Sequence, residues 1–463
     1  MDILNDTDFD LSVLDAERLS SLIEERNFTT LKKILINMQE ADIALLIDEC
    51  PPKQKTLVFR LLSKENAAET FARLEPDSQR QLIESFNDAE LASIIAELYV
   101  DDAVDLIEEM PAMVVKRIIK AVGKEDREAI NKILKYPKDS AGSVMTTEYV
   151  RFVGDMTVEE ALAHIRRVAI DKETIYNCYV TDKDRHLIGI VTAKELLLSS
   201  LDTRLFDIMN ENVIVANTHD ERGEVARKLE KYDFLAIPVV DNERRLVGIV
   251  TVDDAIDVIT EEIEEDIAKM AAITPTETPY LKSSVFSIFT SRVPWLLLLM
   301  ISSTISSAIL GGFEAALPAV LVLFVPMIMG TGGNSGGQTS VTVTRSISLG
   351  EIEFSDLIRV VWKELRVGVL CGLAVGAATL AKVILIDMLL LANHAITMVV
   401  ALTVSLSLTL TIIVAKLIGA VLPILAKKIG LDPAVMASPL ITTLVDAVSL
   451  VVYFFIASSV LGI

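Results

Sequence analysis

The stretch PAVMASPLITTLVDAVSLVVYFFIASSVLGI, residues 433–463, decides the class of protein, because it is long and apolar enough to cross a lipid bilayer. Its single charged residue is Asp446. A carboxylate at mid-membrane costs a few kcal/mol or more, so such residues usually face a water-filled pathway and act on ions or protons. At about 1.5 Å per residue, Asp446 lies roughly 20 Å along a helix that starts near Pro433, a depth that predicts a place in a pore.

Charge and hydrophobicity separate along the chain. The 463 residues are 51% hydrophobic, yet the formal net charge is −22. Most charged residues lie before Arg292 and nearly all that follows is apolar, so we expect a soluble half to precede a membrane half. The acidic N-terminus lacks the apolar core of a signal peptide. The three cysteines are scattered and form no CxxC motif, which fits a reducing cytosol. We expect them to be small buried side chains without metal or redox chemistry.

Five segments reach the length of a membrane span: residues 293–311, 315–343, 367–391, 396–425 and 433–463. Lys and Arg lie before the first span, between the second and third, and between the fourth and fifth, whereas the other two loops lack them. By the positive-inside rule, this distribution predicts a cytoplasmic N-terminus and a C-terminus outside the cell.

The second span contains GTGGNSGGQ, residues 330–338, which we expect to interrupt the helix and line a cavity. The alternative is a face of small residues against which a neighbouring helix packs. Asn334 and Gln338 are amides four residues apart, and they favour a polar lining.

The fifth span carries Ser438, Thr442 and Asp446 at i, i+4 and i+8, so all three lie on one helical face. Oxygen ligands without clustered His or Cys suit a hard cation. Because Mg²⁺ gives up its waters reluctantly, a ring of carboxylates that holds a hydrated ion is a sensible filter, and a homodimer would supply two Asp446 side chains. The alternative is that Asp446 relays protons in a secondary transporter.

An internal repeat occupies residues 145–198 and 209–259. Each copy reads strand, helix, strand, strand, helix, and contains the run GIVT, at residues 189–192 and 248–251. This tandem resembles a pair of CBS domains, which associate and often bind adenine nucleotides. Thr251 and Asp254 are similar to the ribose-binding Thr and Asp of that family, whereas the first copy has Thr192 and Glu195.

Before the repeat, residues 11–122 show short helical patterns with brief connectors, which predict a small α-helical superhelix. The sequence contains neither HExxH, which a membrane metalloprotease requires, nor GxxxxGK[ST], which an ATP-driven pump requires, and both classes are therefore disfavoured.

Residues 253–266 contain eight acids and no base, with isoleucines spaced as on one helical face. Like charges three and four residues apart destabilise a helix, and divalent cations would relieve that repulsion. The alternative is a merely solvated acidic face. The position directly before the first span favours a regulatory role, and the acids around Asp101 and Asp105 offer a partner surface.

These parts in this order resemble the MgtE family of magnesium channels, most specifically through GTGGNSGGQ and LDPAVMASPLITTLVD. The resemblance implies that Asp446 is the pore aspartate that binds hydrated Mg²⁺, that the carbonyl of Thr442 lines the filter, and that Asn334 faces the pore. Ser438 stands where some members carry Asn. For the cytosolic side it implies Mg²⁺ sites made of these acids: Asp432 with Glu262, Glu265 and Asp266, and Asp254 and Asp257 with Asp101 and Asp105.

The resemblance also implies a multidomain fold: an acidic α-helical superhelix N domain (1–135), α/β tandem CBS domains (136–200 and 201–258), a long acidic connecting plug helix and linker (259–279), and an all-α transmembrane domain with five helices (280–463). It implies a homodimer in the lipid of the cell (plasma or inner) membrane. Mg²⁺ is the expected ion, ATP is a candidate ligand at Thr251 and Asp254 of the CBS pair, and no nucleic-acid partner is expected.

The expected function is import of Mg²⁺ through a Mg²⁺-selective channel that closes when cytosolic Mg²⁺ bridges the acidic faces. The main alternative is a secondary divalent-cation transporter coupled to Na⁺ or H⁺. A CBS-regulated membrane enzyme is a third class, for which the sequence offers no nucleophile or metal triad. We therefore expect no enzymatic activity.

Overall fold

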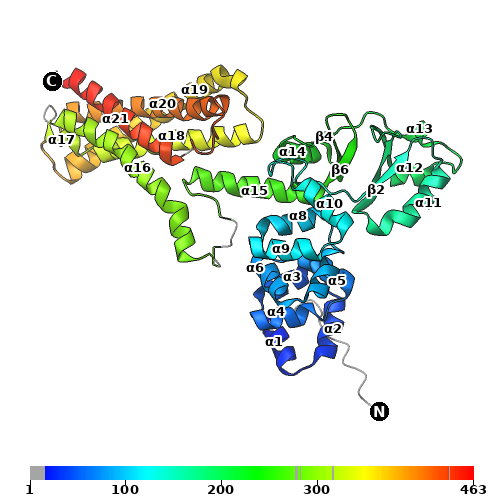
Figure 1. Cartoon of the computed structure of the whole chain (residues 1–463). Coiled ribbons are helices and arrows are strands. Elements are labelled where there is room, and N and C mark those ends of the chain that lie inside the picture. Colours follow the sequence, from blue (N-terminus) through cyan, green and yellow to red (C-terminus); the bar gives the residue numbers. More distant parts are fainter. Residues whose placement is uncertain (1–15, 277–279, 282, 315–317, 437, 463) are drawn as a thin grey trace, which may run out of the picture. The chain divides into compact units, whose positions relative to one another are not determined.

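The computed structural model describes residues 16–276, 280–281, 283–314, 318–436 and 438–462. The chain divides into two compact units, Met1–Ile259 and Thr260–Ile463, and each is described by itself. Figure 1 shows short helices in the first part of the chain, two small sheets next, and long helices toward the C-terminus. This composition confirms the multidomain fold class predicted from the sequence.

From residue 16 on, where the description of the structure begins, ten short helices build the N-terminal part of the first unit, and each packs on helices close to it in the chain. Local contacts of this kind produce a superhelix, as predicted. The helices are short because polar caps and prolines restart them, for example Asn87, whose side chain accepts from two backbone amides of α7. The ten helices are α1 Ala16–Glu24, α2 Phe28–Ile36, α3 Glu40–Glu49, α4 Pro52–Phe59, α5 Lys64–Ala72, α6 Pro76–Ser85, α7 Asp88–Ile95, α8 Val100–Glu109, α9 Ala112–Ala121 and α10 Lys124–Ile133.

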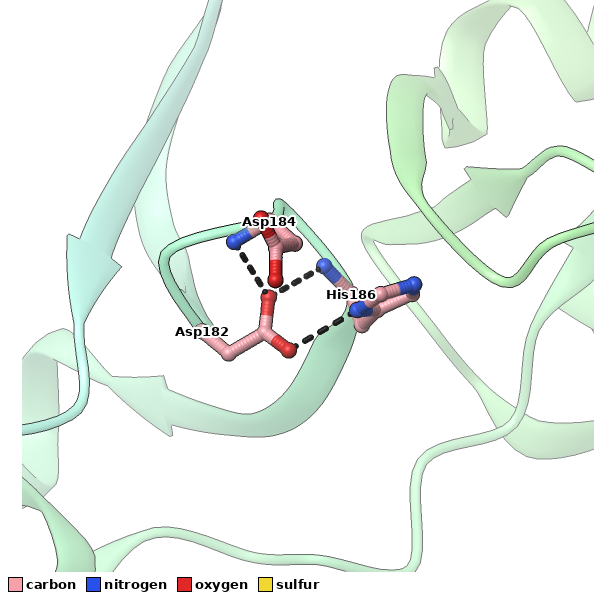
Figure 2. Close-up of side chains that lie close together, drawn as sticks. All are labelled: Asp182, Asp184 and His186. Carbon is pink, nitrogen blue, oxygen red and sulfur yellow. Dashed lines mark hydrogen bonds and ion pairs between the residues drawn. The ribbon is translucent and has the colours of Figure 1, made fainter.

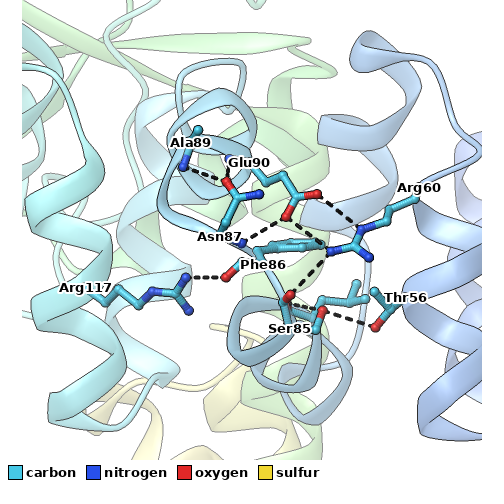
Figure 3. A network of polar contacts seen from close by, with 9 residues as sticks. Thr56, Arg60, Ser85, Phe86, Asn87, Ala89, Glu90 and Arg117 are labelled. Carbon is cyan, nitrogen blue, oxygen red and sulfur yellow. Dashed lines mark hydrogen bonds and ion pairs between the residues drawn. The ribbon is translucent and has the colours of Figure 1, made fainter.

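A polar network ties several of these helices together (Figure 3). The Arg60 guanidinium of the α4 C-terminus forms an ion pair with Glu90 at 3.2 Å. Glu90 also accepts from the backbone N–H of Asn87 at 2.9 Å, which closes the capping box of α7. Arg117 of α9 donates to the carbonyl oxygen of Phe86. Phe86 in turn packs against Phe59 with ring centroids 5.4 Å apart, so the network covers an aromatic core.

The repeat forms two three-stranded sheets in which each central strand pairs parallel with the first and antiparallel with the third. The predicted order of strand, helix, strand, strand, helix is confirmed in both copies. The first copy contains β1 Tyr149–Val153, α11 Val158–Val168, η1 Ala169–Asp171, β2 Thr174–Thr181, β3 Leu187–Thr192 and α12 Ala193–Leu198. After α13 Leu205–Ile208, the second contains β4 Ala216–Asn217, α14 Arg222–Tyr232, β5 Ala236–Val240, β6 Leu246–Thr251 and α15 Val252–Met270.

Helix α15 is the acidic helix predicted before the first span, and it runs on from β6 without a break in the chain. The predicted helix is present. Ala255 and Val258 are its buried side chains and Ile259 packs against the same core, whereas Ile263 and Ile267 are 54% and 59% exposed. The first two turns of α15 are therefore held in the core of the first unit by Ala255 and Val258.

The second unit contains five helices long and apolar enough to cross a membrane among the described residues, as predicted: Val285–Phe313, Ala319–Ser348, Phe354–Leu390, Met398–Lys428 and Pro439–Leu461. Helices α18, α20 and α21 pack on one another, α19 packs on α20, and α16 packs on α21. The elements are α16 Val285–Glu314, α17 Ala319–Val322, α18 Val325–Ser348, η2 Phe354–Asp356, α19 Leu357–Lys382, η3 Val383–Leu390, α20 Met398–Lys428 and α21 Ser438–Leu461.

The expected interruption of the helix at residues 330–338 is wrong, because α18 is continuous from Val325 to Ser348. The glycines serve instead to bring helices close together. A Cβ built on Gly336 would lie 3.0 Å from Val445 and 3.3 Å from the carbonyl oxygen of Ala415, and one built on Gly419 would meet the carbonyl oxygen of Gly336. The alternative interpretation, a face of small residues for helix packing, is therefore correct for this side of α18.

Candidate ion pathway and acidic sites

Asp446 lies on α21 beside the glycine face of α18. A Cβ built on Gly333 would lie 2.7 Å from Cγ2 of Thr442 and 3.2 Å from Oδ1 of Asp446, so only a residue without a side chain fits there. Since α21 begins at Ser438 and not near Pro433, Asp446 lies about 12 Å along its helix, less than the sequence suggested. Thr442 and Asp446 share a face as predicted, but the Ser438 side chain lies outside the described residues.

Oδ1 of Asp446 is buried and has no hydrogen-bond partner among the described residues. Three hydroxyl oxygens in the same bundle are also buried without a hydrogen-bond partner among the described residues: Ser335 on α18, Thr411 on α20 and Ser449 on α21. Ser449 and Thr411 both approach Gly332, since a Cβ built there would lie 2.5 Å and 2.8 Å from their side chains. Buried polar oxygens without partners are costly, so their concentration along α18, α20 and α21 indicates a polar interior that water or ions would satisfy.

Asn334 lies on a different side of α18 from the glycines that meet α21. It is exposed and, with Gly337, Gln338, Val341 and Thr342, lines an open groove of about 560 Å³. Asn334 and Gln338 thus line the same groove, and their place along an ion pathway stays a prediction. Among the described residues, Asn334 and Asp446 share no hydrogen bond.

The structure also contains a buried charged network that was not predicted from the sequence. The Lys416 ammonium of α20 donates to Oγ1 of Thr339 on α18 at 3.2 Å, and the Thr339 hydroxyl donates to Oε2 of Glu364 on α19 at 3.1 Å. Lys416 is only 6% exposed. A signal was available, because Lys416 is an ionisable residue inside the predicted fourth span, as Asp446 is in the fifth.

We expect Lys416→Met and Glu364→Gln each to lower the thermal unfolding temperature of the detergent-solubilised protein by several degrees. Each change leaves the opposite charge partly buried without compensation, a cost of about 1–3 kcal/mol. The double variant should lose less than the sum of the single losses. Lys363→Gln, an exposed neighbour of Glu364, is the control. Strictly additive losses would show that the network does not couple the two charges.

The predicted acids at the end of α15 meet Asp432 through a lysine. The Lys269 ammonium lies 2.6 Å from Oε1 of Glu265 and 2.6 Å from Oδ2 of Asp432. Asp266 instead accepts from the Ser348 hydroxyl at 2.9 Å. The structure thus brings Glu265 and Asp432 together with a cation between them, and it places Asp266 against the end of α18. Glu262 lies on the same helix, one turn before Asp266.

A second acidic site lies in the first unit, where α8 meets the start of α15. Asp101 is 8% exposed, and burial raises its pKa well above the usual range, with a further increase from the charge of Asp254. Burial, reinforced by Asp254, also raises the pKa of Asp105 to about 7. The predicted group of Asp101, Asp105 and Asp254 is therefore brought together. Asp257 lies one turn beyond Asp254, and burial also raises its pKa.

Two members of this second site were not predicted as site residues. Burial and the charge of Asp254 raise the pKa of Asp102 to about 7, and burial and the charge of Asp253 raise the pKa of Glu173 to about 8. The adjacency of Asp102 to Asp101 was a sequence signal. Glu173 directly precedes β2, and only the folded repeat brings it to the acids of α8 and α15.

Asp254 has a role inside the repeat as well. Its Oδ2 accepts from the Thr251 hydroxyl at 2.6 Å. The two residues expected at a nucleotide ribose are therefore hydrogen-bonded to each other, and Asp254 also belongs to the acidic site. In the first copy, Thr192 and Glu195 form the capping box that starts α12.

Asp182, Asp184 and His186 bring their possible metal ligands within 4.8 Å of one another (Figure 2). The geometry has a local explanation. Oδ1 of Asp182 accepts from the backbone N–H groups of Asp184 and His186 at 2.9 Å and 2.8 Å, and Oδ2 lies 2.8 Å from Nδ1 of His186. Asp182 thus caps the turn between β2 and β3, as such residues commonly do.

Three family models match the chain. The model described as a divalent cation transporter, MgtE, matches residues 325–456, and the MgtE intracellular N domain matches residues 38–139. The CBS domain matches twice, at residues 141–202 and 205–261. Together the matches cover the helical superhelix from α3 onward, both copies of the repeat, and most of the helices that carry Asp446 and Asn334.

Relatives of full length are similar to the whole chain. The magnesium transporter MgtE of Thermus thermophilus is 35% identical over 448 residues, which cover 96% of this chain and 97% of that protein. The magnesium transporter MgtE of Bacillus subtilis is 32% identical and covers 96% of each chain. A solved structure of the cytosolic domain of the Mg²⁺ channel MgtE in complex with ATP is 36% identical, with a TM-score of 0.50, and covers 52% of this chain and 99% of that one.

Proposed function

Because the chain belongs to the MgtE family of divalent cation transporters, a family of transporters and not of enzymes, we propose that it is a multi-pass membrane protein that imports Mg²⁺ through a Mg²⁺-selective channel. The observation that carries the proposal is Asp446. Its carboxylate lies beside Gly333 in a helix bundle, and neither its buried oxygen nor several hydroxyls around it have a hydrogen-bond partner in the part of the chain that the structure describes. An intramembrane carboxylate in that position suits a hydrated hard cation.

Transport through the bundle needs a second copy of the chain. Asn334, Gln338 and Thr342 recur at i, i+4 and i+8 and are exposed along one side of α18. Amides and hydroxyls that face lipid are unfavourable. A homodimer that joins two such faces would remove them from lipid and enclose a polar pathway. The N-terminus would then be cytoplasmic and the C-terminus outside, as the Lys and Arg distribution predicts.

The cytosolic acids would sense Mg²⁺. Asp101, Asp102, Asp105 and Asp254 crowd like charges in a partly buried place, and so hold protons at a pH where isolated carboxyl groups do not. Mg²⁺ prefers carboxylate oxygens and would replace those protons. Binding would hold α8 to α15 and favour closure, whereas loss of Mg²⁺ would restore the repulsion.

Mg²⁺ uptake into liposomes tests the transport function. We expect the reconstituted protein to pass Mg²⁺ down its gradient without a Na⁺ or proton gradient. The secondary-transporter alternative requires one of those gradients, so uptake that depends on either would overturn the channel proposal. ATP is proposed as a second ligand at the CBS pair, on the likeness to the ATP-bound cytosolic domain. Tighter ATP binding in the wild type than in Thr251→Ala would support that site.

Mg²⁺ binding to residues 1–270 should release protons near neutral pH. The pKa values of Asp254, Asp102 and Glu173 are raised to about 6, 7 and 8, chiefly by burial. Because the pKa values are raised where α8 contacts α15, this contact, the docked arrangement of the first unit, is most stable when the groups are protonated. It loses that stability as pH rises through about 6–8. Apparent Mg²⁺ affinity should therefore increase over the same window, because fewer protons compete.

Calorimetric titration in two buffers of different ionisation enthalpy measures the protons released. The same titration well above the window, near pH 9, is the control and should release few protons. Equal proton release at both pH values would contradict a role for the raised pKa values in Mg²⁺ binding.

A further inference from the structure

Lys269 occupies the gap that a bridging cation would use. Its ammonium lies 2.6 Å from Glu265, one turn earlier on α15, and 2.6 Å from Asp432, on the segment that precedes α21. The other carboxylate oxygen of Asp432 accepts from the backbone N–H of Ala434 at 2.8 Å, which holds the acid in place. The Lys269 side chain is 24% exposed, so this contact is partly shielded from solvent.

We propose that Lys269 is a tethered cation that competes with Mg²⁺ for the gap between Glu265 and Asp432, and so determines how much Mg²⁺ is needed to dock the end of α15. The proposal rests on the proposed gating by cytosolic Mg²⁺. Lys269 carries the charge opposite to that of the acids around it. Its presence would make the site between Glu265 and Asp432 select divalent over monovalent cations.

The charges of the three groups explain the competition. Two carboxylates and one ammonium leave a net charge of −1, so Lys269 holds the acids together without neutralising them. A divalent ion would neutralise the pair, but it cannot share the gap with an ammonium at contact distance because the two cations repel each other. Mg²⁺ must therefore displace Lys269. A monovalent ion offers no more charge than the ammonium, which a four-residue spacing on one helix keeps permanently close to Glu265.

Two consequences follow for a variant without the ammonium. In Lys269→Gln, the contact between α15 and Asp432 without Mg²⁺ is lost, so the docked fraction at zero Mg²⁺ falls. Mg²⁺ then meets no competitor, so less Mg²⁺ is needed to raise the docked fraction above its starting value. Lys269→Arg keeps the charge and should resemble the wild type. For a partly exposed ion pair of this kind, we expect roughly three- to ten-fold changes in the docked fraction without Mg²⁺ and in the Mg²⁺ concentration needed to raise that fraction.

Distances between spin labels at exposed Glu264 and Ile429 measure docking in the full chain, in lipid nanodiscs and after replacement of the three native cysteines. MgCl₂ is titrated against wild type, Lys269→Gln and Lys269→Arg, each in the labelled background. We expect the glutamine variant to show a smaller short-distance population without Mg²⁺, and to double that population at a lower Mg²⁺ concentration.

The other outcomes overturn the proposal in distinguishable ways. A smaller population without Mg²⁺, but an unchanged concentration for doubling, would make Lys269 a simple tether and not a competitor. No change in either quantity would make it a surface ion pair without a role. If the distance distribution of the wild type did not change with Mg²⁺, the proposed gating by cytosolic Mg²⁺ would be contradicted, and with it the competition.

Discussion

Asp446→Asn is expected to lower Mg²⁺ flux at least about ten-fold while the protein still folds and inserts. Asparagine has the shape of aspartate and fits the space beside Gly333 and Thr442. The change removes the one formal charge that α21 offers to an ion. In a homodimer it removes two such charges from the pathway.

The size of the effect follows from the cost of bringing a divalent ion into an apolar bundle. Solvation losses for a doubly charged ion are large, and fixed opposite charge is the main compensation available. Loss of about 1.4 kcal/mol of that compensation corresponds to ten-fold, and two carboxylates should contribute more than this. Flux into liposomes, read with a Mg²⁺-sensitive dye inside, measures the outcome.

Asp387 and Lys382 provide a matched control. They form a 2.7 Å ion pair where α19 continues into η3, so Asp387 is a second carboxylate in the membrane half, but one that is already neutralised. The double variant Lys382→Gln/Asp387→Asn removes a carboxylate with no net change in charge and should keep most of the flux. Equal loss in both variants would assign the Asp446 effect to general damage, and unchanged flux in Asp446→Asn would contradict its role as the pore acid.

The sequence predicted the parts that local rules govern. The five spans follow from runs of apolar residues, and the repeat follows from GIVT and the alternation of strand and helix. Both are confirmed because length and periodicity depend on nearby residues. The likeness to the magnesium transporter MgtE of Thermus thermophilus extends over 96% of this chain.

The errors arise where tertiary contacts override local preference. Glycines at residues 330–338 favour an interrupted helix in isolation, but close approach of α20 and α21 makes the missing side chains favourable and keeps α18 continuous. The contact of Lys269 with Asp432 joins residues that are 163 positions apart. No spacing rule relates them, so the acids were predicted and the cation between them was not.

Asp254→Asn should remove most of the Mg²⁺ dependence of the cytosolic unit. Asp254 is the neighbouring charge that contributes most to the raised pKa values of Asp101, Asp102 and Asp105, after burial itself. Asparagine can still bond to the Thr251 hydroxyl, so local structure should persist. Without this charge, the acids of α8 meet a neutral side chain, and the site loses one carboxylate that Mg²⁺ would bind.

The weaker repulsion and the lost carboxylate ligand both reduce the Mg²⁺ response. Less repulsion makes the docked arrangement more stable without Mg²⁺, and fewer ligands make Mg²⁺ add less stability when it binds. Residues 1–270 of the variant should therefore resist limited proteolysis without Mg²⁺ and gain little protection from millimolar Mg²⁺. In the full chain, flux should be low at both low and high cytosolic Mg²⁺.

Asp184→Asn separates the role of this site from a general effect of net charge. Asp184 lies in the exposed turn before β3, and its replacement removes one negative charge from the same unit. The long-range effect of an exposed charge is screened within about 8–10 Å, so this variant should keep the wild-type response.

If Asp184→Asn and Asp254→Asn weakened the Mg²⁺ response equally, net charge alone would control docking. A full Mg²⁺ response in Asp254→Asn would show that the remaining acids, with Glu173 among them, suffice to bind the ion. The contrast between the two variants therefore tests whether burial beside α8 makes a carboxylate a sensor.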